Sequence, residues 1–348
     1  MNSWKTLIPN EYVEMNQCEE TMVGRVIRQA KQAYTVKVDE EEFTCKLPGK
    51  FYYENIESEN FPVVGDWVLC KREAGDIGLI HSIFQRTSKF SRKKAGDDFT
   101  EQIIAVNVDT LFIVTSLNED VNIRRIERYL MLALESGAEP VILLSKGDLC
   151  PSLTQVMAEL RALSKTVEMI PVSIYEEWGM EKMLPYLEPG KTIAFVGSSG
   201  VGKSTIVNHL LGGSVQQTKN IREKDGKGVH TTTSRELFYL PNGTAVIDTP
   251  GMREIQIWEG KQGLSLEFED IESLAEQCYF RNCSHRNEQG CAITVGIQGG
   301  ILDAERFQSY QKLLREQEYN KRKSDVRARI EEKKVWKKRS KASRRNRR

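Results

Sequence analysis

TIAFVGSSGVGKST occupies residues 192–205 and decides how the rest of the chain is interpreted. Its first five residues are mostly apolar and β-prone, and the residues after the Gly-x-x-x-x-Gly-Lys-Ser loop have helical spacing. A strand–loop–helix of this kind binds phosphate, because its glycines let backbone N–H groups and the helix N-terminus face the anion. Lys203 is expected to reach the β- and γ-phosphates, and Ser204 to ligate Mg²⁺. The predicted phosphate-binding residues are Gly197, Ser198, Ser199, Gly200, Val201, Gly202, Lys203, Ser204 and Thr205.

The composition describes a globular protein that does not contact a membrane. With 348 residues the chain is expected to form two or three domains, and no apolar run approaches the roughly 20 residues of a membrane span. Its first residues, MNSWK, lack the apolar core of a signal peptide. A cytoplasmic protein is therefore expected.

Positive charge is concentrated at the C-terminus. Residues 333–348 contain ten Lys or Arg and no acid, whereas the whole chain has a net charge of +1, so the remainder sums to about −9. Such a stretch binds polyanions electrostatically, which favours RNA as a partner over a role in solubility alone. Residues 321–348 are predicted to form this basic tail.

Residues 21–90 contain about five short β-prone runs separated by turn signals. This spacing favours a small barrel, and an OB-fold is predicted after a lead-in of residues 1–20. Such barrels often bind RNA through a basic, aromatic face, for which the candidates are Lys50, Phe51, Tyr52, Tyr53, Lys71 and Arg72. Charged side chains on a barrel surface are equally often exposed to solvent without binding a partner, so both interpretations stay open.

From residue 91 to residue 262 the pattern changes to alternating strands and helices. After a polar linker over residues 86–100, strands are expected near 110–115, 140–144, 167–172, 192–196, 236–239 and 244–247, with helices at 123–136 and 153–164. This alternation is typical of a mainly parallel sheet with helices on both faces. The phosphate-binding loop therefore belongs to a three-layer α/β domain.

Two further segments follow the loop in the order of a nucleotide switch. Asp248-Thr249-Pro250-Gly251 ends a predicted strand, so Asp248 can hold Mg²⁺ through water and the Gly251 N–H can sense the γ-phosphate. Residues 228–233, GVHTTT, form a Gly-hinged polar loop. Within it Thr232, with Thr231 as the second choice, can ligate Mg²⁺ only while a γ-phosphate is present. Either segment alone is weak, but their order and spacing indicate a switch.

The residues predicted to recognise the base precede the loop. Ser145, Lys146, Gly147 and Asp148 directly follow the strand expected at 140–144. The Asp148 carboxylate can accept both the N1–H and the N2–H₂ of guanine, whereas adenine offers neither donor, and a mismatch of this kind discriminates strongly. The Lys146 stem can lie along the base, and Val172-Ser173 can close over it.

Three cysteines and a histidine cluster near the C-terminus. Cys278, Cys283, His285 and Cys291 provide three thiolates and an imidazole within fourteen residues. Zn²⁺ prefers such a soft tetrahedral set, and a site closed by four protein ligands is structural rather than catalytic. Residues 263–320 are therefore predicted to form a small zinc-binding domain that holds one ion.

The order of these motifs distinguishes the chain from ordinary Ras-like GTPases, in which the base-recognition motif follows the phosphate loop. Here it comes first, so the domain is circularly permuted. With a barrel before it and a Cys/His cluster after it, the chain resembles the RsgA (YjeQ/YloQ) family over roughly residues 20–320. That resemblance implies a bacterial GTPase that uses GTP or GDP with Mg²⁺ and acts in maturation of the small (30S) ribosomal subunit. It also supports the same four residues as ligands of one structural Zn²⁺.

Two positions depart from GTPase patterns. The family usually has Asn where this chain has Ser145, so the tether to the base or the phosphate loop is expected to be weaker. Met252 stands where many GTPases place a water-orienting Gln, and a thioether cannot orient water. Slow intrinsic hydrolysis is therefore expected. His230 is a candidate for positioning the water, and an ordinary loop role for it is equally compatible with the sequence.

The function favoured by the sequence is a monomeric GTPase that binds the small ribosomal subunit and its rRNA as a nucleotide-controlled switch. The catalytic candidates are His230, Thr232 and Asp248. An alternative is a P-loop ATPase or small-molecule kinase with incidental RNA binding, although Asp148 argues against adenine. A second alternative, an RNA-binding module with a vestigial nucleotide site, conflicts with the intact Lys203 and Ser204.

Overall fold

The computed structural model describes residues 8–9, 12, 21–30, 33–54, 61–73, 77–93, 101–118, 121–161, 167–212, 236–248, 268–286, 288–315 and 318. The chain forms two compact units, residues 1–92 with 102–255 and residues 93–101 with 256–348. The five-part division predicted from the sequence is finer than this and stays a prediction. Among the described residues, no helix combines the length and apolar character needed to cross a membrane.

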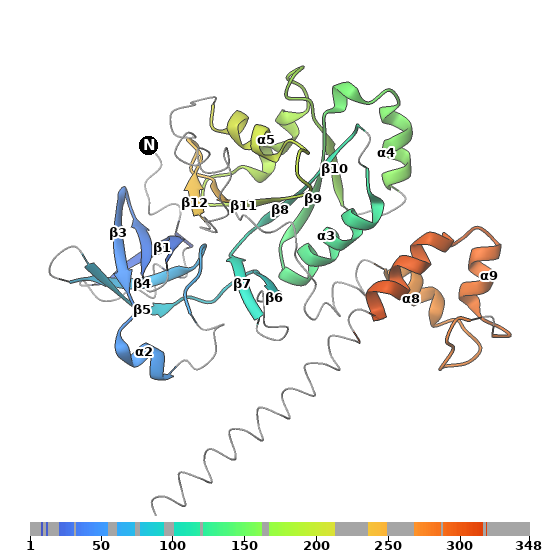
Figure 1. Ribbon diagram of the computed structural model, residues 1–348, viewed down its shortest axis with the longest axis horizontal. Helices are drawn as coiled ribbons and strands as arrows, with labels where there is room; N and C mark the ends of the chain where they lie inside the picture. Colours follow the sequence, from blue (N-terminus) through green and yellow to red (C-terminus); the bar gives the residue numbers. More distant parts are fainter. Residues whose placement is uncertain are drawn as a thin grey trace, which may run out of the picture. The chain divides into compact units, whose positions relative to one another are not determined.

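The N-terminal part of the first unit is a closed barrel. Its strands are β1 (Met22–Gln29), β2 (Tyr34–Val38), β3 (Glu41–Lys46), β4 (Trp67–Arg72) and β5 (Ile77–Ile83). They are hydrogen-bonded in the order β1-β2-β3-β5-β4, and β4 pairs again with β1 to close the barrel (Figure 1). Alternation along β3 buries Phe43 and Cys45 inside and leaves their neighbours exposed. The predicted five-stranded barrel is confirmed.

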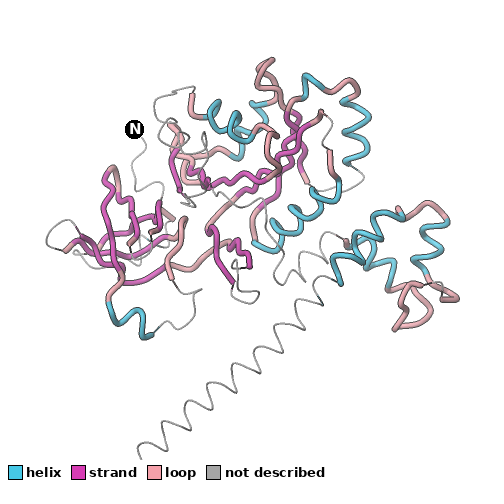
Figure 2. Tube along the Cα trace, in the orientation of Figure 1, coloured by secondary structure: helices cyan, strands magenta, loops and turns pink. Residues whose placement is uncertain are grey.

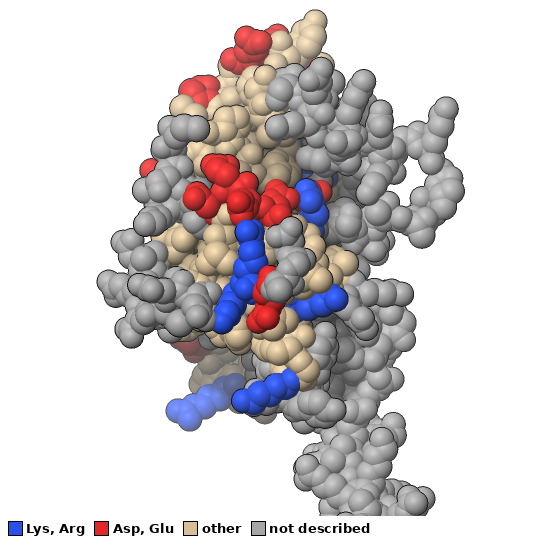
Figure 3. Space-filling view, turned by 90° about the vertical axis from the view of Figure 1, so that its left-hand side faces the viewer, with Lys and Arg blue, Asp and Glu red and all other residues tan. Residues whose placement is uncertain are grey.

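A short helix, α2 (Gly49–Glu54), lies between β3 and β4 where the sequence suggested only a turn. Phe51, a candidate for stacking on RNA, instead packs against the barrel core and lies 6.0 Å from the ring of Phe61. The barrel surface carries paired charges, because Arg72 binds Glu41 and Arg28 binds Glu42. Figure 3 shows acidic side chains next to basic ones on this side of the molecule. The described surface of the barrel is therefore not uniformly basic.

The rest of the first unit is a three-layer α/β structure. Six strands lie in the order β10-β9-β8-β11-β13-β12, and all neighbouring pairs are parallel except β12–β13. Figure 2 shows helices flanking this sheet. The strands are β8 (Thr110–Ser116), β9 (Glu139–Ser145), β10 (Glu168–Pro171), β11 (Thr192–Val196), β12 (Glu236–Tyr239) and β13 (Ala245–Asp248).

Side chains alternate along these strands between two apolar layers. One layer packs with α3 (Ile123–Ser136) and α4 (Leu153–Arg161). The other packs with the 3₁₀ helix η4 (Met180–Tyr186) and with α5 (Lys203–Leu210). Helix α3 begins at Asn122, whose side chain accepts from the Arg125 N–H, and ends at Gly137 in the left-handed conformation. Helices thus cover both faces of the sheet, as predicted.

The barrel and this sheet are joined by backbone pairing and by a buried cation. Strand β1 pairs with β12 through Arg28 and Glu236, so the two parts form a single eleven-stranded sheet. Arg25 of β1 is only 2% exposed. Its guanidinium donates to the Thr192 hydroxyl at 3.0 Å and stacks 4.6 Å from the ring of Trp67. The bond to Thr192 links the barrel to the first residue of β11, and the contact with Trp67 fixes the guanidinium within the barrel.

The polar linker predicted for residues 86–100 is wrong in part. Strands β6 (Lys89–Lys93) and β7 (Glu101–Val106) pair as a two-stranded ribbon. Phe90 in β6 is fully buried although charged residues surround it in the sequence. The apolar end of β7 likewise packs inward, with Ile104 and Val106 buried. The polar sequence around Phe90 therefore gave no sign of strand β6, although the buried Phe90 side chain packs this strand against the rest of the protein.

The second unit contains α8 (Glu269–Ala275), α9 (Ala292–Gln298) and a helix over residues 304–315. Helices α8 and α9 approach closely, because a side chain on Gly296 would meet Leu274 at 2.7 Å. Arg306 pairs with Asp270 at 3.0 Å and lies over the ring of Phe268. The core is small, with Phe268, Ile271, Ile293, Leu302, Phe307 and Leu313 as its buried apolar residues among those described.

Candidate functional site

The predicted phosphate-binding loop follows β11 and leads into α5. Gly197, Gly200 and Gly202 have φ of +141°, +82° and +93°, backbone angles that residues with a side chain rarely adopt. At Gly197 a Cβ would also clash with the carbonyl oxygen of Val114 in β8. Glycine is therefore required where the loop leaves the sheet, and the first turn of α5 begins at Lys203.

Two cations converge on Ser198 in this loop. The Lys203 ammonium donates to the carbonyl oxygens of Gly197 at 2.7 Å and of Ser198 at 2.5 Å, so it lies folded over the loop. Arg125, near the start of α3, donates from Nη1 to the Ser198 hydroxyl. Arg125 was not predicted as a site residue, since it lies 73 positions from Ser198 and no sequence motif marks it. The loop is thus positively charged on the side where phosphate is expected.

Ser145 ties the base-recognition turn to the phosphate loop. It ends β9, is buried, and its hydroxyl lies 2.6 Å from the carbonyl oxygen of Val201 and 3.1 Å from that of Thr115. From the sequence, a hydroxyl in place of the usual Asn is expected to make this tether weaker, and that expectation stays a prediction. In the structure the hydroxyl reaches the loop directly.

The predicted base-recognition residues lie together at the carboxyl ends of β9 and β10. Lys146 has a left-handed φ of +56°, and it caps the 3₁₀ turn η3 (Gly147–Leu149), which carries Asp148. The Ser173 hydroxyl donates to Asp148 Oδ1 at 2.6 Å, and the Gly147 N–H donates to the Val172 carbonyl at 3.0 Å. The two segments predicted to surround a guanine are therefore in contact.

The switch residues predicted from the sequence, His230, Thr231, Thr232 and Gly251, lie outside the described residues. Asp248 is the last residue of β13, and the structure describes its backbone but not its side chain. Because β13 runs parallel to β11, with Ile247 beside Ala194, the backbone of Asp248 lies at the edge of the sheet that also bears the phosphate loop. The roles assigned to these residues stay predictions.

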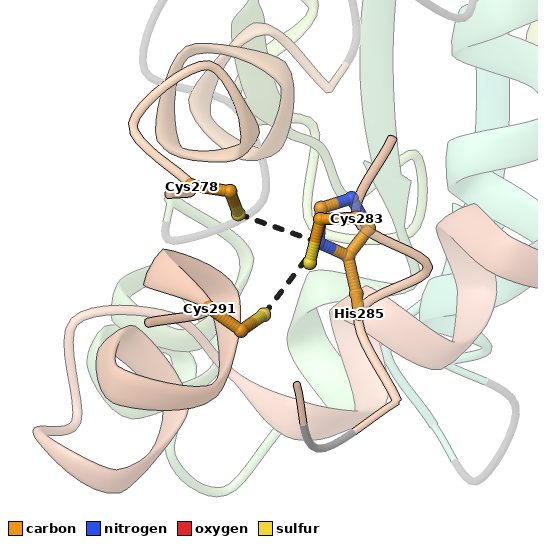
Figure 4. Close-up of side chains that lie close together, drawn as sticks. All are labelled: Cys278, Cys283, His285 and Cys291. Atoms are coloured by element: carbon orange, nitrogen blue, oxygen red, sulfur yellow. Dashed lines mark hydrogen bonds between the residues drawn. The ribbon is translucent and has the colours of Figure 1, made fainter. Parts of the chain in front are cut away.

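The second unit brings the four predicted metal ligands together. The ligand atoms of Cys278, Cys283, His285 and Cys291 all lie within 4.8 Å of one another, and their side chains converge (Figure 4). Nδ1 of His285 lies 3.6 Å from the sulfurs of both Cys278 and Cys291. Tetrahedral Zn²⁺, with bonds of about 2.3 Å to sulfur and 2.0–2.1 Å to nitrogen, places these atoms about 3.6 Å apart. The donor set and its spacing fit Zn²⁺.

Glu288 braces the loop that carries two of these ligands. Its carboxylate accepts from the backbone N–H groups of Ser284 at 3.0 Å and of Arg286 at 2.7 Å, and also from the Ser284 hydroxyl. These bonds, first that from the Ser284 hydroxyl, lower the pKa of Glu288 to about 2. Glu288 was not predicted from the sequence, because a glutamate between two metal ligands cannot be told from an ordinary surface residue. Such outer contacts orient metal ligands.

Comparison with known proteins accounts for this combination of parts. The family model described as RsgA GTPase matches residues 83–258, which is half of the chain. A relative in Vibrio vulnificus, "Small ribosomal subunit biogenesis GTPase RsgA 2", is 42% identical over 91% of this chain and 87% of its own length. Its namesake in Lactiplantibacillus plantarum is 46% identical over 86% of this chain and 84% of its own length.

The chain belongs to the RsgA GTPase family. It is therefore a GTP hydrolase, and the resemblance noted in the sequence is confirmed. Among solved structures, YjeQ from Thermotoga maritima is 25% identical, with a TM-score of 0.63 over 85% of this chain and 98% of that one. YloQ, described as a circularly permuted GTPase, is 23% identical and shows the same fold, with a TM-score of 0.61 over 87% of this chain and 97% of that one.

A model described as ABC transporter also matches residues 181–341. That segment begins just before the phosphate-binding loop, a feature that many nucleotide-binding proteins share. It does not include Asp148 or Ser173, which lie on the other side of the permutation. The RsgA match and the two relatives named above include both parts of the site.

Proposed function

We propose that this GTPase binds the small (30S) ribosomal subunit and its rRNA during late maturation, as a switch controlled by its nucleotide. Its GTP form holds the subunit, and hydrolysis to GDP and phosphate releases it. The relatives named above, which cover most of the chain, are described as acting in small ribosomal subunit biogenesis. Ribosomal subunits mature in the cytoplasm of bacteria, where the protein is expected to act as a monomer.

The observation that carries the choice of nucleotide is the contact between the two halves of the site. Asp148 is fixed by Ser173, and Ser145 ties the same turn to Val201 of the phosphate loop. These contacts support a site in which a base bound at Asp148 would lie at a set distance from phosphates bound at Lys203. Adenine lacks the N1–H and N2–H₂ donors that a carboxylate needs at this place. GTP satisfies both ends of the site.

Mg²⁺ would be held by the hydroxyls of Ser204 and, in the GTP state, Thr232, with Asp248 acting through water. The ion would neutralise charge on the β- and γ-phosphates. Zn²⁺ would be held by Cys278, Cys283, His285 and Cys291, and would stabilise a unit whose apolar core is small. The basic tail would contribute affinity for rRNA without sequence specificity.

Because Met252 cannot orient water, the intrinsic rate should be slow, and the small subunit should accelerate it. The test is hydrolysis of GTP and of ATP, each measured with and without purified small subunits. Turnover of GTP alone, stimulated by small and not by large subunits, is expected. Equal turnover of ATP would favour a P-loop ATPase or kinase, and GTP turnover indifferent to subunits would refute the ribosomal role.

A further inference from the structure

A six-residue loop beside Asp148 is closed by its own backbone. Ser173 and Trp178 exchange two backbone hydrogen bonds, of 3.0 and 3.1 Å. Within the loop the Glu176 N–H donates to the Ser173 hydroxyl at 3.1 Å, and that hydroxyl donates to Asp148. This chain of bonds orients the Ser173 proton toward the carboxylate. The loop therefore determines where the Asp148 oxygen lies.

Trp178 connects this loop to the turn that carries Asp148. Its ring lies directly on Gly147, where an added Cβ would be 2.8 Å from Cζ2 and closer still to Cη2. The indole N–H donates to a carboxylate oxygen of Glu176 at 3.0 Å. On its other side Gly179, with φ of +85°, lies so close to the Pro171 carbonyl that a side chain would clash. The Trp178 ring thus lies against the Gly147 turn, and the backbone of the next residue, Gly179, lies against the end of β10.

We propose that Trp178 is a positioning residue for guanine recognition, because its ring locks the Asp148 turn onto the Ser173 loop. This inference rests on the proposed role of Asp148. The turn η3 has three residues and follows a left-handed residue, so it has little packing of its own. A carboxylate that pairs with two donors on one base edge must be held in place, and small displacements reduce discrimination more than general affinity. Trp178 supplies that restraint through its contact with Gly147.

The test compares dissociation constants for GDP, IDP and a non-hydrolysable GTP analogue. Hypoxanthine in IDP keeps N1–H and lacks the N2 amine, so the GDP-to-IDP preference reports how Asp148 is placed. Trp178→Ala should reduce this preference by roughly tenfold or more, because a lost hydrogen bond to a charged group has that weight. The ratio between GDP and the GTP analogue should stay at the wild-type value, since the phosphate loop is unchanged. Trp178→Phe keeps an aromatic ring but lacks Cζ2 and Cη2, the atoms nearest Gly147, so it should restore only part of the preference.

Tyr175→Ala is the matched control. Tyr175 is an aromatic residue of the same loop but is 90% exposed. This variant should retain the wild-type GDP-to-IDP preference. An equal loss in Tyr175→Ala and Trp178→Ala would mean that the loop as a whole, and not the Trp178 ring, positions the carboxylate. That result would overturn the proposal.

Gly147→Ala tests the same contact from the other side, because its methyl group would displace the Trp178 ring. It should lower the base preference, and its effect should not add to that of Trp178→Ala in the double variant. It also serves if Trp178→Ala does not fold. Asp148→Asn separates the two hypotheses. If Asp148→Asn leaves base preference unchanged, the proposed guanine site is wrong; if it alters preference while Trp178→Ala and Gly147→Ala do not, only the role of Trp178 is wrong.

Discussion

At the scale of single residues, the Asp148 carboxylate is proposed to determine which base is accepted. Asp148→Asn replaces one acceptor by an amide donor, so the N2 amine of guanine meets N–H while the C2 carbonyl of xanthine finds a donor. Affinity for GDP should fall at least about 100-fold, and affinity for XDP should rise. Competition binding with both nucleotides measures the exchange. Wild-type protein that binds ADP as tightly as GDP would contradict the assignment.

A second prediction at this scale concerns Arg125. Its contact with Ser198 places a cation beside the phosphate loop, and its removal should weaken binding more for a triphosphate than for a diphosphate, which carries less charge. Arg125→Ala should lower affinity for a GTP analogue by about 5- to 30-fold. Arg124→Ala, an exposed neighbour on the same helix, is the matched control. Equal affinities in both variants and the wild type would show that Arg125 serves only the packing of α3.

At the scale of elements, the loop with the four candidate ligands is proposed to depend on Zn²⁺, because the apolar core of the second unit is small among the described residues. Cys283→Ser removes one thiolate, and the metal content should fall from about one Zn²⁺ per chain toward zero, with loss of protection from proteolysis in the second unit. Glu288→Gln keeps all four ligands and removes the charge that accepts from Ser284 and Arg286. This variant should lower the affinity for Zn²⁺ by about 10-fold or more. A full complement of metal in Cys283→Ser, measured by elemental analysis, would exclude that ligand.

Elements with strong periodicity were predictable, and those that depend on distant contacts were not. Helix α3 has the predicted bounds, since apolar spacing, an Asn cap and a terminal glycine agree. Helix α2 and strand β6 escaped prediction, because among the residues whose side chains are described Phe51 and Phe90 pack them against surfaces made by other segments. Short polar elements of this kind carry too little local signal.

The same division applies to the site. The glycines, Lys203 and Ser204 follow from a local motif, and so does the Cys/His set. Arg125 and Trp178 do not, because each acts on a loop that another part of the chain contributes. Ser145 shows the limit most clearly. Its hydroxyl lies 2.6 Å from the carbonyl oxygen of Val201, 56 positions away in the sequence, so no local motif could predict this contact. The weaker tether expected for Ser in place of Asn stays a prediction.

At the scale of the whole molecule, the barrel is bound to the GTPase sheet by strand pairing and by Arg25. These two parts belong to one compact unit, while the four candidate metal ligands belong to the other. The segment after Gly251 leads from the phosphate site into that second unit. If GTP orders this segment, we expect the change to alter how the second unit binds the small subunit. The buried contacts of Arg25 keep the barrel fixed to its sheet meanwhile.

The last prediction joins the nucleotide to the ribosome. Thr232 is proposed to bind Mg²⁺ only beside a γ-phosphate, so a non-hydrolysable GTP analogue should strengthen binding to small subunits over GDP by about 1–3 kcal/mol, or roughly 5–150-fold. Thr232→Ala should erase most of this difference and retain GDP binding. Deletion of residues 333–348 removes ten cations, which should lower affinity in both states and flatten its salt dependence while the ratio persists. Co-sedimentation across a salt series measures all three, and equal binding with GDP and the analogue at every salt concentration would refute the switch.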